Sequence, residues 1–563
     1  MTTPSTPRGS MSKRLKVLYS LLSLVLAFVG VVTLFGDNIR KHFGANTASL
    51  AGNPDVAYRK SMRTFGENTA YGNDGATASV DSLQRKPMRH FNSGAYAEAP
   101  APSQHVERLA SNAYTRTEND PLSTFAVDVD TASYALFRRA VKGDRLPSAD
   151  TVRVEEWVNY FRYRIPEPKP DEGAFHVALE AAPSPFAPSQ HILKVSLQGR
   201  HVAKAQRKPT HLVFLVDTSG SMNGQDRLEL AKTSMKLAVS GLNPADTVTI
   251  STYAGDVRTV LDTTPARDRK VIEAAIDGLS SGGGTAMGSG LELAYQHAVR
   301  MAGANRVSRV VVLTDGDTNL GRNQTADAML ESISRYVKEG VTLSTIGFGM
   351  GNYRDDLMER LANKGNGNCY YIDSEREARR VLQEQLGGTM EVIAQDVKIQ
   401  VEFDPTAVRG YRLLGYENRA IADNDFRKDA VDAGEIGAGH TVTALYELDL
   451  TGEGSTVATV RVRAKKPGDS EVAEQRFTLP RHQVRESLST ASSDLRFALA
   501  VAGTADLLRG TTPTDDRGFA RIHSLAEDAV DGQEDREEFL TLLGKLRELM
   551  SPRLVRNANP TRY

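Results

Sequence analysis

One short stretch constrains the fold of this chain more than any other. The apolar run His211 to Val216 leads directly into Asp217-Thr218-Ser219-Gly220-Ser221. A short run rich in β-branched and aromatic residues is typical of a buried strand in a parallel sheet. Ligand sites of open α/β sheets form where such strands end. The stretch therefore predicts an α/β domain with polar side chains gathered at the end of one central strand.

Two later segments supply the same kinds of side chain. The loop Ser281-Gly282-Gly283-Gly284-Thr285 carries a hydroxyl, and a second apolar run leads into Thr314-Asp315-Gly316. Taken alone, an Asp-x-Ser-x-Ser segment is most often an ordinary turn. Its combination with the glycine-rich loop and with Asp315 favours a metal site, because carboxylate and hydroxyl oxygens are the ligands that hard divalent cations prefer.

The order and spacing of these segments resemble the metal-ion-dependent adhesion site of von Willebrand factor type A (VWA) domains. The resemblance implies a Rossmann-like α/β domain with a parallel central sheet. It also implies a bound Mg2+, with Mn2+ and Ca2+ as alternatives, and a protein partner whose Glu or Asp completes the metal coordination. The five implied metal ligands are Asp217, Ser219, Ser221, Thr285 and Asp315.

Alternating strand and helix signals extend over residues 206–387, the predicted VWA domain. Strands are predicted near 211–216, 247–253, 257–261, 309–314, 341–348 and 369–372, and helices near 227–240, 268–277, 291–301, 325–339, 353–363 and 375–386. The implied ligands fall at strand ends or in loops just before helices, where the resemblance requires them.

The beginning of the chain predicts a membrane anchor. Residues 1–16 carry four Lys or Arg, and Val17 to Phe35 is a run of nineteen uncharged residues, about the length that crosses a bilayer core. This run is longer than the apolar region of a cleaved signal peptide, so an uncleaved signal anchor at 17–36 is favoured. The excess of cations before it places 1–16 in the cytoplasm and the rest of the chain outside, in the periplasm or at the cell surface.

The remaining segments divide by composition and periodicity. Residues 37–115 are poor in apolar runs and predict a disordered linker. Strict alternation at Val397, Ile399, Val401 and Phe403 predicts a β-sandwich over 388–480. We expect it to recruit the strands of 171–205, because a two-stranded hairpin is only marginally stable alone.

Helical periodicity over 485–509 and 534–549 predicts a helical C-terminal region, residues 481–563. A strand followed by two helices, the second burying Trp157 and Phe161, is expected in the segment 116–170. This N-terminal segment and the C-terminal region resemble those that accompany VWA domains in a family of bacterial envelope proteins.

Two further patterns have competing interpretations. Asp128 and Asp130 are candidates for a second metal site, but strand alternation with Val127 and Val129 favours an ordinary strand. The only cysteine, Cys369, lies in a predicted strand, which favours a small buried side chain over a reactive thiol.

Composition and motifs exclude several classes of function. A net charge of -1 does not favour nucleic-acid binding, because such binding needs a basic face. Gly278 to Gly282 matches G-x-S-x-G, but a predicted helix precedes it, whereas a nucleophile elbow requires a strand. The simplest motifs for nucleotide hydrolysis and zinc proteolysis do not occur. We therefore expect a metal-dependent binding protein of the cell envelope and not an enzyme. A structural scaffold that the metal only stabilises, and an accessory protein of a AAA-type ATPase, are the alternatives.

Overall fold

The computed structural model describes residues 110–558, apart from 128, 304, 317–325, 350–354, 386–387, 389–390, 430, 432, 468–470 and 512–515. The described residues belong to one compact unit, Glu98–Tyr563. The predicted cytoplasmic tail, the membrane anchor and nearly all of the linker lie outside them. Within the described part of the chain, no helix combines the length and the apolar character needed to span a bilayer.

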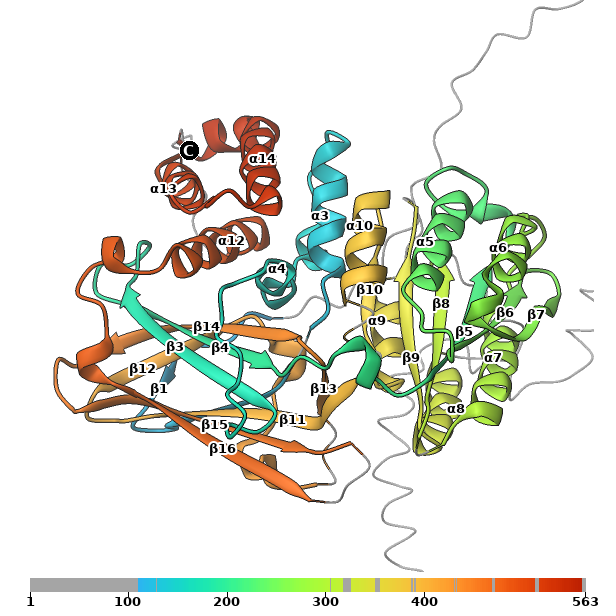
Figure 1. Ribbon diagram of the computed structural model, residues 1–563. Coiled ribbons are helices and arrows are strands. Elements are labelled where there is room, and N and C mark those ends of the chain that lie inside the picture. The colour runs from blue at the N-terminus through green and yellow to red at the C-terminus, as the bar shows by residue number, and fades with distance from the viewer. Residues whose placement is uncertain are drawn as a thin grey trace, which may run out of the picture. The chain divides into compact units, whose positions relative to one another are not determined.

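The central sheet of the predicted VWA domain has six strands in the order β10-β9-β8-β5-β6-β7 (Figure 1). The parallel strands are β5 (Thr210–Asp217), β6 (Thr247–Tyr253), β8 (Val307–Thr314), β9 (Val341–Gly347) and β10 (Cys369–Tyr371). The edge strand β7 (Val257–Pro265) runs antiparallel to β6. The sheet is therefore mixed, which corrects the expectation of a parallel sheet. Only three residues connect β6 to β7, too few for the crossover that a parallel pair needs.

Helices cover both faces of this sheet because the side chains of β5 alternate between two cores. Phe214 and Val216 pack with α5 (Leu228–Ser240), α6 (Arg269–Asp277) and α10 (Glu375–Arg379). Val213 and Leu215 pack on the other face with α7 (Met287–Met301), α8 (Ala326–Lys338) and α9 (Asp355–Lys364). Cys369 is buried in this second core, which agrees with its predicted role as a small apolar side chain.

A β-sandwich flanks the VWA domain in sequence. One sheet has the order β1-β12-β14-β4-β3, and the other β13-β11-β15-β16 with β2 paired to β11. Their strands are β1 (Thr115–Arg116), β2 (Leu122–Ala126), β3 (Phe175–Pro183), β4 (His191–Gly199), β11 (Val392–Phe403), β12 (Val408–Leu414), β13 (Gly434–Gly437), β14 (Thr441–Leu450), β15 (Thr456–Lys465) and β16 (Val472–Pro480). Strand β4 of the hairpin β3–β4 pairs with β14. This confirms that the hairpin, which would be only marginally stable alone, is part of the sandwich.

The VWA domain is inserted between β4 and β11, and both of its ends meet at one turn of the sandwich. The amide of Gly439 donates to the carbonyl of Arg200 at 3.1 Å, just after β4. The amide of Ala438 donates to the carbonyls of Gly388 at 3.1 Å and Glu391 at 2.8 Å, just before β11. The chain therefore leaves and re-enters the sandwich at adjacent points.

A helical layer packs on the sandwich and unites the two ends of the described chain. It contains α3 (Ala132–Lys142), α4 (Val154–Tyr160), α12 (Ser493–Arg509), α13 (Asp516–Glu527) and α14 (Glu534–Ala558). Trp157 and Phe161 lie in its core, as the sequence predicts. The helix expected from residue 485 begins only at 493, because the hydroxyl of Ser492 caps it by accepting from the amide of Leu495. Helix α13 was not predicted.

A buried ion-pair cluster joins this layer to the VWA domain. The guanidinium of Arg138 on α3 lies 2.5 Å from the carboxylate of Asp373, just before α10, and 2.9 Å from that of Glu377 on α10. The hydroxyl of Tyr160 also donates to Glu377, at 2.8 Å. Burial raises the pKa of Glu377, but Arg380 and Arg138 outweigh it and lower this pKa to about 2. The carboxylate is therefore held in its charged form.

Candidate metal centre

Asp217 is the last residue of β5 and is fully buried. Its Oδ1 accepts a hydrogen bond from the backbone amide of Ser219 at 2.9 Å, and its Oδ2 accepts one from Oγ1 of Thr314 at 2.9 Å. Both donors come from strand ends that parallel pairing of β5 with β8 brings side by side. The carboxylate is therefore fixed in orientation at the carboxyl edge of the sheet.

The two serines extend this cluster to the second carboxylate. The hydroxyl oxygens of Ser219 and Ser221 lie 2.9 Å apart, and the hydroxyl of Ser221 donates to Oδ1 of Asp315 at 3.2 Å. Four of the five predicted ligands, Asp217, Ser219, Ser221 and Asp315, thus lie in one hydrogen-bonded group. Their role as metal ligands stays a prediction.

The loop that carries Thr285 is attached to the same place. The amide of Gly282 donates to the carbonyl of Thr218 at 2.8 Å, and the amide of Gly220 donates to the carbonyl of Gly283 at 3.2 Å. Gly283 has a φ of +88°, a conformation that a residue with a Cβ rarely adopts. The side chain of Thr285 is half-buried, and no hydrogen bond among the described residues joins it to the other four. The structure places the loop at the cluster but leaves the ligand role of Thr285 a prediction.

The electrostatics of the cluster suit a cation. Burial raises the pKa of Asp217 to about 6, while hydrogen bonds from Ser219 and Thr314 lower it and the nearby charge of Asp315 raises it. A divalent cation between the two carboxylates would offset the cost of burying this charge. No three His, Cys, Asp or Glu side chains of the described residues converge on a possible metal position. A metal here would therefore depend on hydroxyl oxygens as well, a donor set that fits Mg2+.

Three neighbours of the cluster were missed by the sequence reasoning. Thr314 orients Asp217, and Nη1 of Arg227 donates to the carbonyl of Ser221 at 2.6 Å. Tyr253 pairs with Asp217 across β6 and β5, and burial, followed by the charge of Asp217, raises its pKa well above the usual range. Two of these neighbours could have been found from their positions in the sequence. Thr314 directly precedes Asp315, and Tyr253 is the last residue of the neighbouring strand β6.

The position of Asp128 and Asp130, where the sequence disfavours a second metal site, has a different environment. Asp130 is buried, accepts from the amide of Cys369 at 2.9 Å and pairs with Arg419 at 3.3 Å. Asp128 lies outside the described residues. At the G-x-S-x-G match, α6 ends at Asp277 and leads directly into Gly278, so a helix precedes Ser280, as the sequence indicates.

Comparison with known proteins agrees with this architecture. Residues 211–385 match the von Willebrand factor type A domain, and residues 101–194 match a family described as von Willebrand factor. Residues 388–457 and 451–549 match the C-terminal domain of the uncharacterized protein YfbK. The fold and these matches define a VWA-domain protein with an associated C-terminal domain.

The similarity to one relative extends over most of both chains. The uncharacterized protein YfbK of Escherichia coli (strain K12) is 38% identical over 463 residues, which cover 78% of this chain and 80% of the relative. The chain belongs to the YfbK family.

More distant similarities are shorter or weaker. The uncharacterized protein sll0103 of Synechocystis sp. is 28% identical over 39% of this chain and 51% of its own length. A solved structure, the von Willebrand factor type A protein from Catenulispora acidiphila, is 17% identical, with a TM-score of 0.43 over 68% of this chain and 91% of that one.

Proposed function

We propose that this chain binds a protein partner through a Mg2+ ion held at the carboxyl edge of the VWA sheet. The proposed ligands are Asp217, Ser219, Ser221, Thr285 and Asp315. The observation that carries the proposal is the hydrogen-bonded group in which Ser221 connects Asp315 to the end of β5. Four of these oxygen donors lie in one hydrogen-bonded group at the edge of the sheet, and the loop that carries Thr285 is attached beside them. This rigid support favours the proposal, because a selective site requires it.

The donor set leaves room for a partner. Mg2+ takes six oxygen ligands in near-octahedral geometry. Five side chains, two carboxylates and three neutral hydroxyls, leave one of the six positions open. A carboxylate from another protein supplies the missing oxygen, so we propose a Glu or Asp of the partner at this position.

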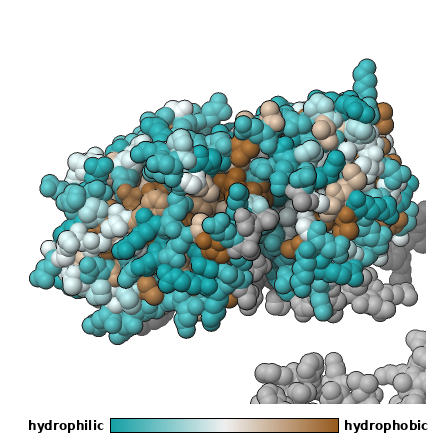
Figure 2. All heavy atoms as spheres, turned by 60° about the horizontal axis from the view of Figure 1, so that its bottom comes forward, coloured by the Kyte–Doolittle hydropathy of each residue, from teal (hydrophilic) through white to brown (hydrophobic). Residues whose placement is uncertain are grey.

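The surface also favours a polar mode of recognition. Tyr114 and Val271 are the exposed large hydrophobic residues of the described chain. The face in Figure 2 is largely hydrophilic, with hydrophobic residues in small separate patches. Stable interfaces without a broad apolar area depend on a few strong polar contacts, and a shared metal ion would provide one.

The proposed setting is the cell envelope. The uncharged run at 17–35 and the preceding cations would anchor the protein as a single-pass membrane protein with the VWA domain outside the cytoplasm. In that location a role beside a cytoplasmic AAA-type ATPase is disfavoured. A purely structural role of the metal remains the alternative, in which the ion stabilises loops without meeting a partner.

Metal titration and partner capture test the proposal together. The full chain in detergent is titrated with Mg2+ by calorimetry, and proteins from solubilised membranes are captured on it with Mg2+ or with EDTA. We expect Mg2+ uptake and a captured protein that EDTA releases, both lost in Asp217→Ala and kept in Ser280→Ala, a change of an exposed serine outside the cluster. Mg2+ uptake with metal-independent capture would support the structural role instead, and absence of uptake would refute the site.

A further inference from the structure

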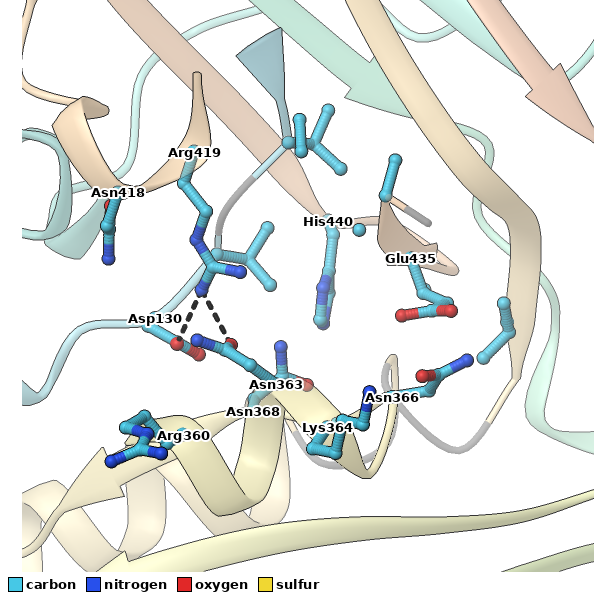
Figure 3. Close-up of a pocket in the computed structure, with 18 of the residues that line it drawn as sticks. Asp130, Arg360, Asn363, Lys364, Asn366, Asn368, Asn418, Arg419, Glu435 and His440 are labelled. Atoms are coloured by element: carbon cyan, nitrogen blue, oxygen red, sulfur yellow. Dashed lines mark hydrogen bonds and ion pairs between the residues drawn. The ribbon is translucent and has the colours of Figure 1, made fainter. Parts of the chain in front are cut away.

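A cavity lies at the end of the VWA sheet opposite to the candidate metal centre. It has a volume of about 380 Å3 and lies between the VWA domain and the sandwich (Figure 3). Arg309, near the beginning of β8, and Asn368, just before β10, line it. Since β5, β8 and β10 are parallel, the cavity adjoins their amino ends, whereas Asp217 and Asp315 lie at the carboxyl ends. The two places are separate.

The walls of the cavity are fixed by contacts across the two domains. Arg419, from the loop after β12, lies 3.3 Å from Asp130 and donates to Oδ1 of Asn363 on α9 at 2.7 Å. Nδ2 of Asn418 donates to Glu359 on the same helix at 2.6 Å. Asp130 is 2% exposed. The cavity is therefore built from held side chains and is not a loose gap.

The charges around the cavity favour an anion. Four cationic side chains line it, against the two carboxylates Asp130 and Glu435. The four cations are Arg309, Arg360, Lys364 and Arg419. The ammonium of Lys364, the last residue of α9, forms no ion pair within the described chain. An anionic group near Lys364 would meet this excess positive charge.

Asparagine side-chain amides of the cavity wall could form hydrogen bonds with a ligand, in addition to the contacts of the cations. Four asparagines, Asn363, Asn366, Asn368 and Asn418, line the cavity. In Figure 3, Arg419, Glu435 and His440 lie on the sandwich side, facing Asn363, Lys364 and Asn366 on the VWA side. Amide groups both donate and accept hydrogen bonds, so they match hydroxyl groups of a ligand. A volume of about 380 Å3 is within the range of small-molecule sites.

We propose that this cavity binds a small organic anion rich in hydroxyl groups, of the class of sugar phosphates and sugar acids. Its phosphate or carboxylate contacts Lys364, and its hydroxyls contact the asparagine amides. The ligand lies against Gly437 and His440, which belong to the turn that holds both ends of the inserted VWA domain. Binding would therefore stabilise the junction of the two domains, since a ligand that binds only the folded arrangement shifts the equilibrium toward it.

Calorimetric titration of the full chain in EDTA tests this, because EDTA removes any contribution of the metal centre. The probes are glucose 6-phosphate, glucuronate, neutral glucose and inorganic phosphate. We expect glucose 6-phosphate or glucuronate to bind, and to bind more tightly than glucose and inorganic phosphate. The first two probes distinguish a phosphate from a carboxylate as the anionic group.

Variants of two lysines, each the last residue of a helix, test whether the ligand binds in this cavity. Lys364→Gln should weaken it about tenfold, the loss of one charge-assisted contact, and Lys364→Glu should weaken it further. Lys338→Gln, at the exposed end of α8, should leave it unchanged. Both lysines are exposed, so folding is not at risk, and unchanged Mg2+ uptake in each variant keeps this result independent of the metal centre.

Four outcomes would overturn the proposal. Binding of none of the four probes would refute the site itself. Equal binding of glucose would refute the need for an anion, and equal binding of inorganic phosphate would refute the hydroxyl contacts. Binding that is insensitive to both changes of Lys364 would place the ligand elsewhere.

Discussion

The hydroxyl of Ser221 donates a hydrogen bond to Oδ1 of Asp315, 3.2 Å away and 94 residues later in the sequence. The contact exists because β5 and β8 are parallel neighbours whose carboxyl ends open into adjacent loops. It makes the two halves of the VWA domain share one polar cluster. A substitution in one of these loops should therefore alter the side-chain positions in the other.

Replacing Ser221 by Ala should weaken Mg2+ binding strongly. The change removes a proposed ligand and also the hydroxyl that positions Asp315. Loss of a supporting contact alone commonly costs 10-fold to 100-fold in metal affinity, so we expect a loss of at least about 100-fold by calorimetry. Ser280→Ala is the control, since Ser280 is exposed and lies outside the cluster. Equal affinities of the two variants would contradict the assignment of Ser221.

The buried carboxylate of Asp217 should make metal-free stability fall with rising pH. Burial raises its pKa from 3.8 to about 6. Between these values the folded protein keeps a proton that the unfolded chain has released, so the free energy of unfolding decreases as the pH rises through this window. For a pKa change of this size the decrease is about 3 kcal/mol.

The isosteric variant Asp217→Asn isolates this contribution. Urea unfolding of both proteins in EDTA, at intervals between about pH 4 and pH 7, should show the decrease in the wild type only. Parallel pH profiles of the two proteins would mean that Asp217 titrates normally.

Two glycines inside helices should respond oppositely to alanine. A Cβ on Gly290 of α7 would lie 2.9 Å from Cβ of Tyr253. Apart from the adjacent residues and backbone of its own helix, no atom of the described residues lies within 4 Å of the corresponding position on Gly544 of α14. We expect Gly290→Ala to destabilise the protein by about 1–3 kcal/mol through overpacking. Gly544→Ala should stabilise it by about 0.5–1 kcal/mol, because alanine favours the helix.

Calorimetric unfolding checks the pair. Because Tyr253 lies beside Asp217, Gly290→Ala should also weaken Mg2+ uptake, which Gly544→Ala leaves unchanged. A stable Gly290→Ala protein with normal uptake would show that Tyr253 can move away without consequence.

Neighbouring arginines of α3 should differ in their effect on stability. Arg138 is 3% exposed and pairs with Asp373 and Glu377, so Arg138→Met removes one cation that compensates two buried carboxylates and leaves only Arg380 beside Glu377. The expected cost is about 3–5 kcal/mol. Arg139 pairs with Asp226, whose side chain is 49% exposed, and Arg139→Met should cost no more than about 1 kcal/mol.

The midpoints of the first thermal transition of the two variants measure this difference. Similar shifts would mean that the cluster around Glu377 contributes no more than the partly exposed pair of Arg139 and Asp226.

The sequence was most informative where an apolar run with strand periodicity is directly followed by polar residues. Strands β5 and β8 could be predicted because each is an apolar run that ends in polar residues, and four of the five proposed ligands lie at or just after those ends. The antiparallel direction of β7 was missed, although the short connection after Tyr253 contains that information.

Long-range pairing and interrupted helices were less accessible. That Thr124 of β2 lies opposite Gln400 of β11 depends on contacts across the whole VWA insertion, which no local pattern records. Helix α13 was missed because Gly518 and the preceding Thr-Thr-Pro-Thr-Asp-Asp stretch are typical of a loop. The cavity at Arg419 could not be predicted for the same reason as the pairing of β2: its lining comes from distant segments. The density of asparagines at 363–368 is the local signal of this cavity.

The turn at Gly437–His440, which holds Arg200 and Gly388 together, gives the VWA domain the character of a cassette. An insert whose two ends are adjacent can be exchanged for another of its kind without lengthening or re-pairing any strand of the host. Grafting of a related domain between residues 200 and 388 is thus a natural route by which such a scaffold acquires a new specificity.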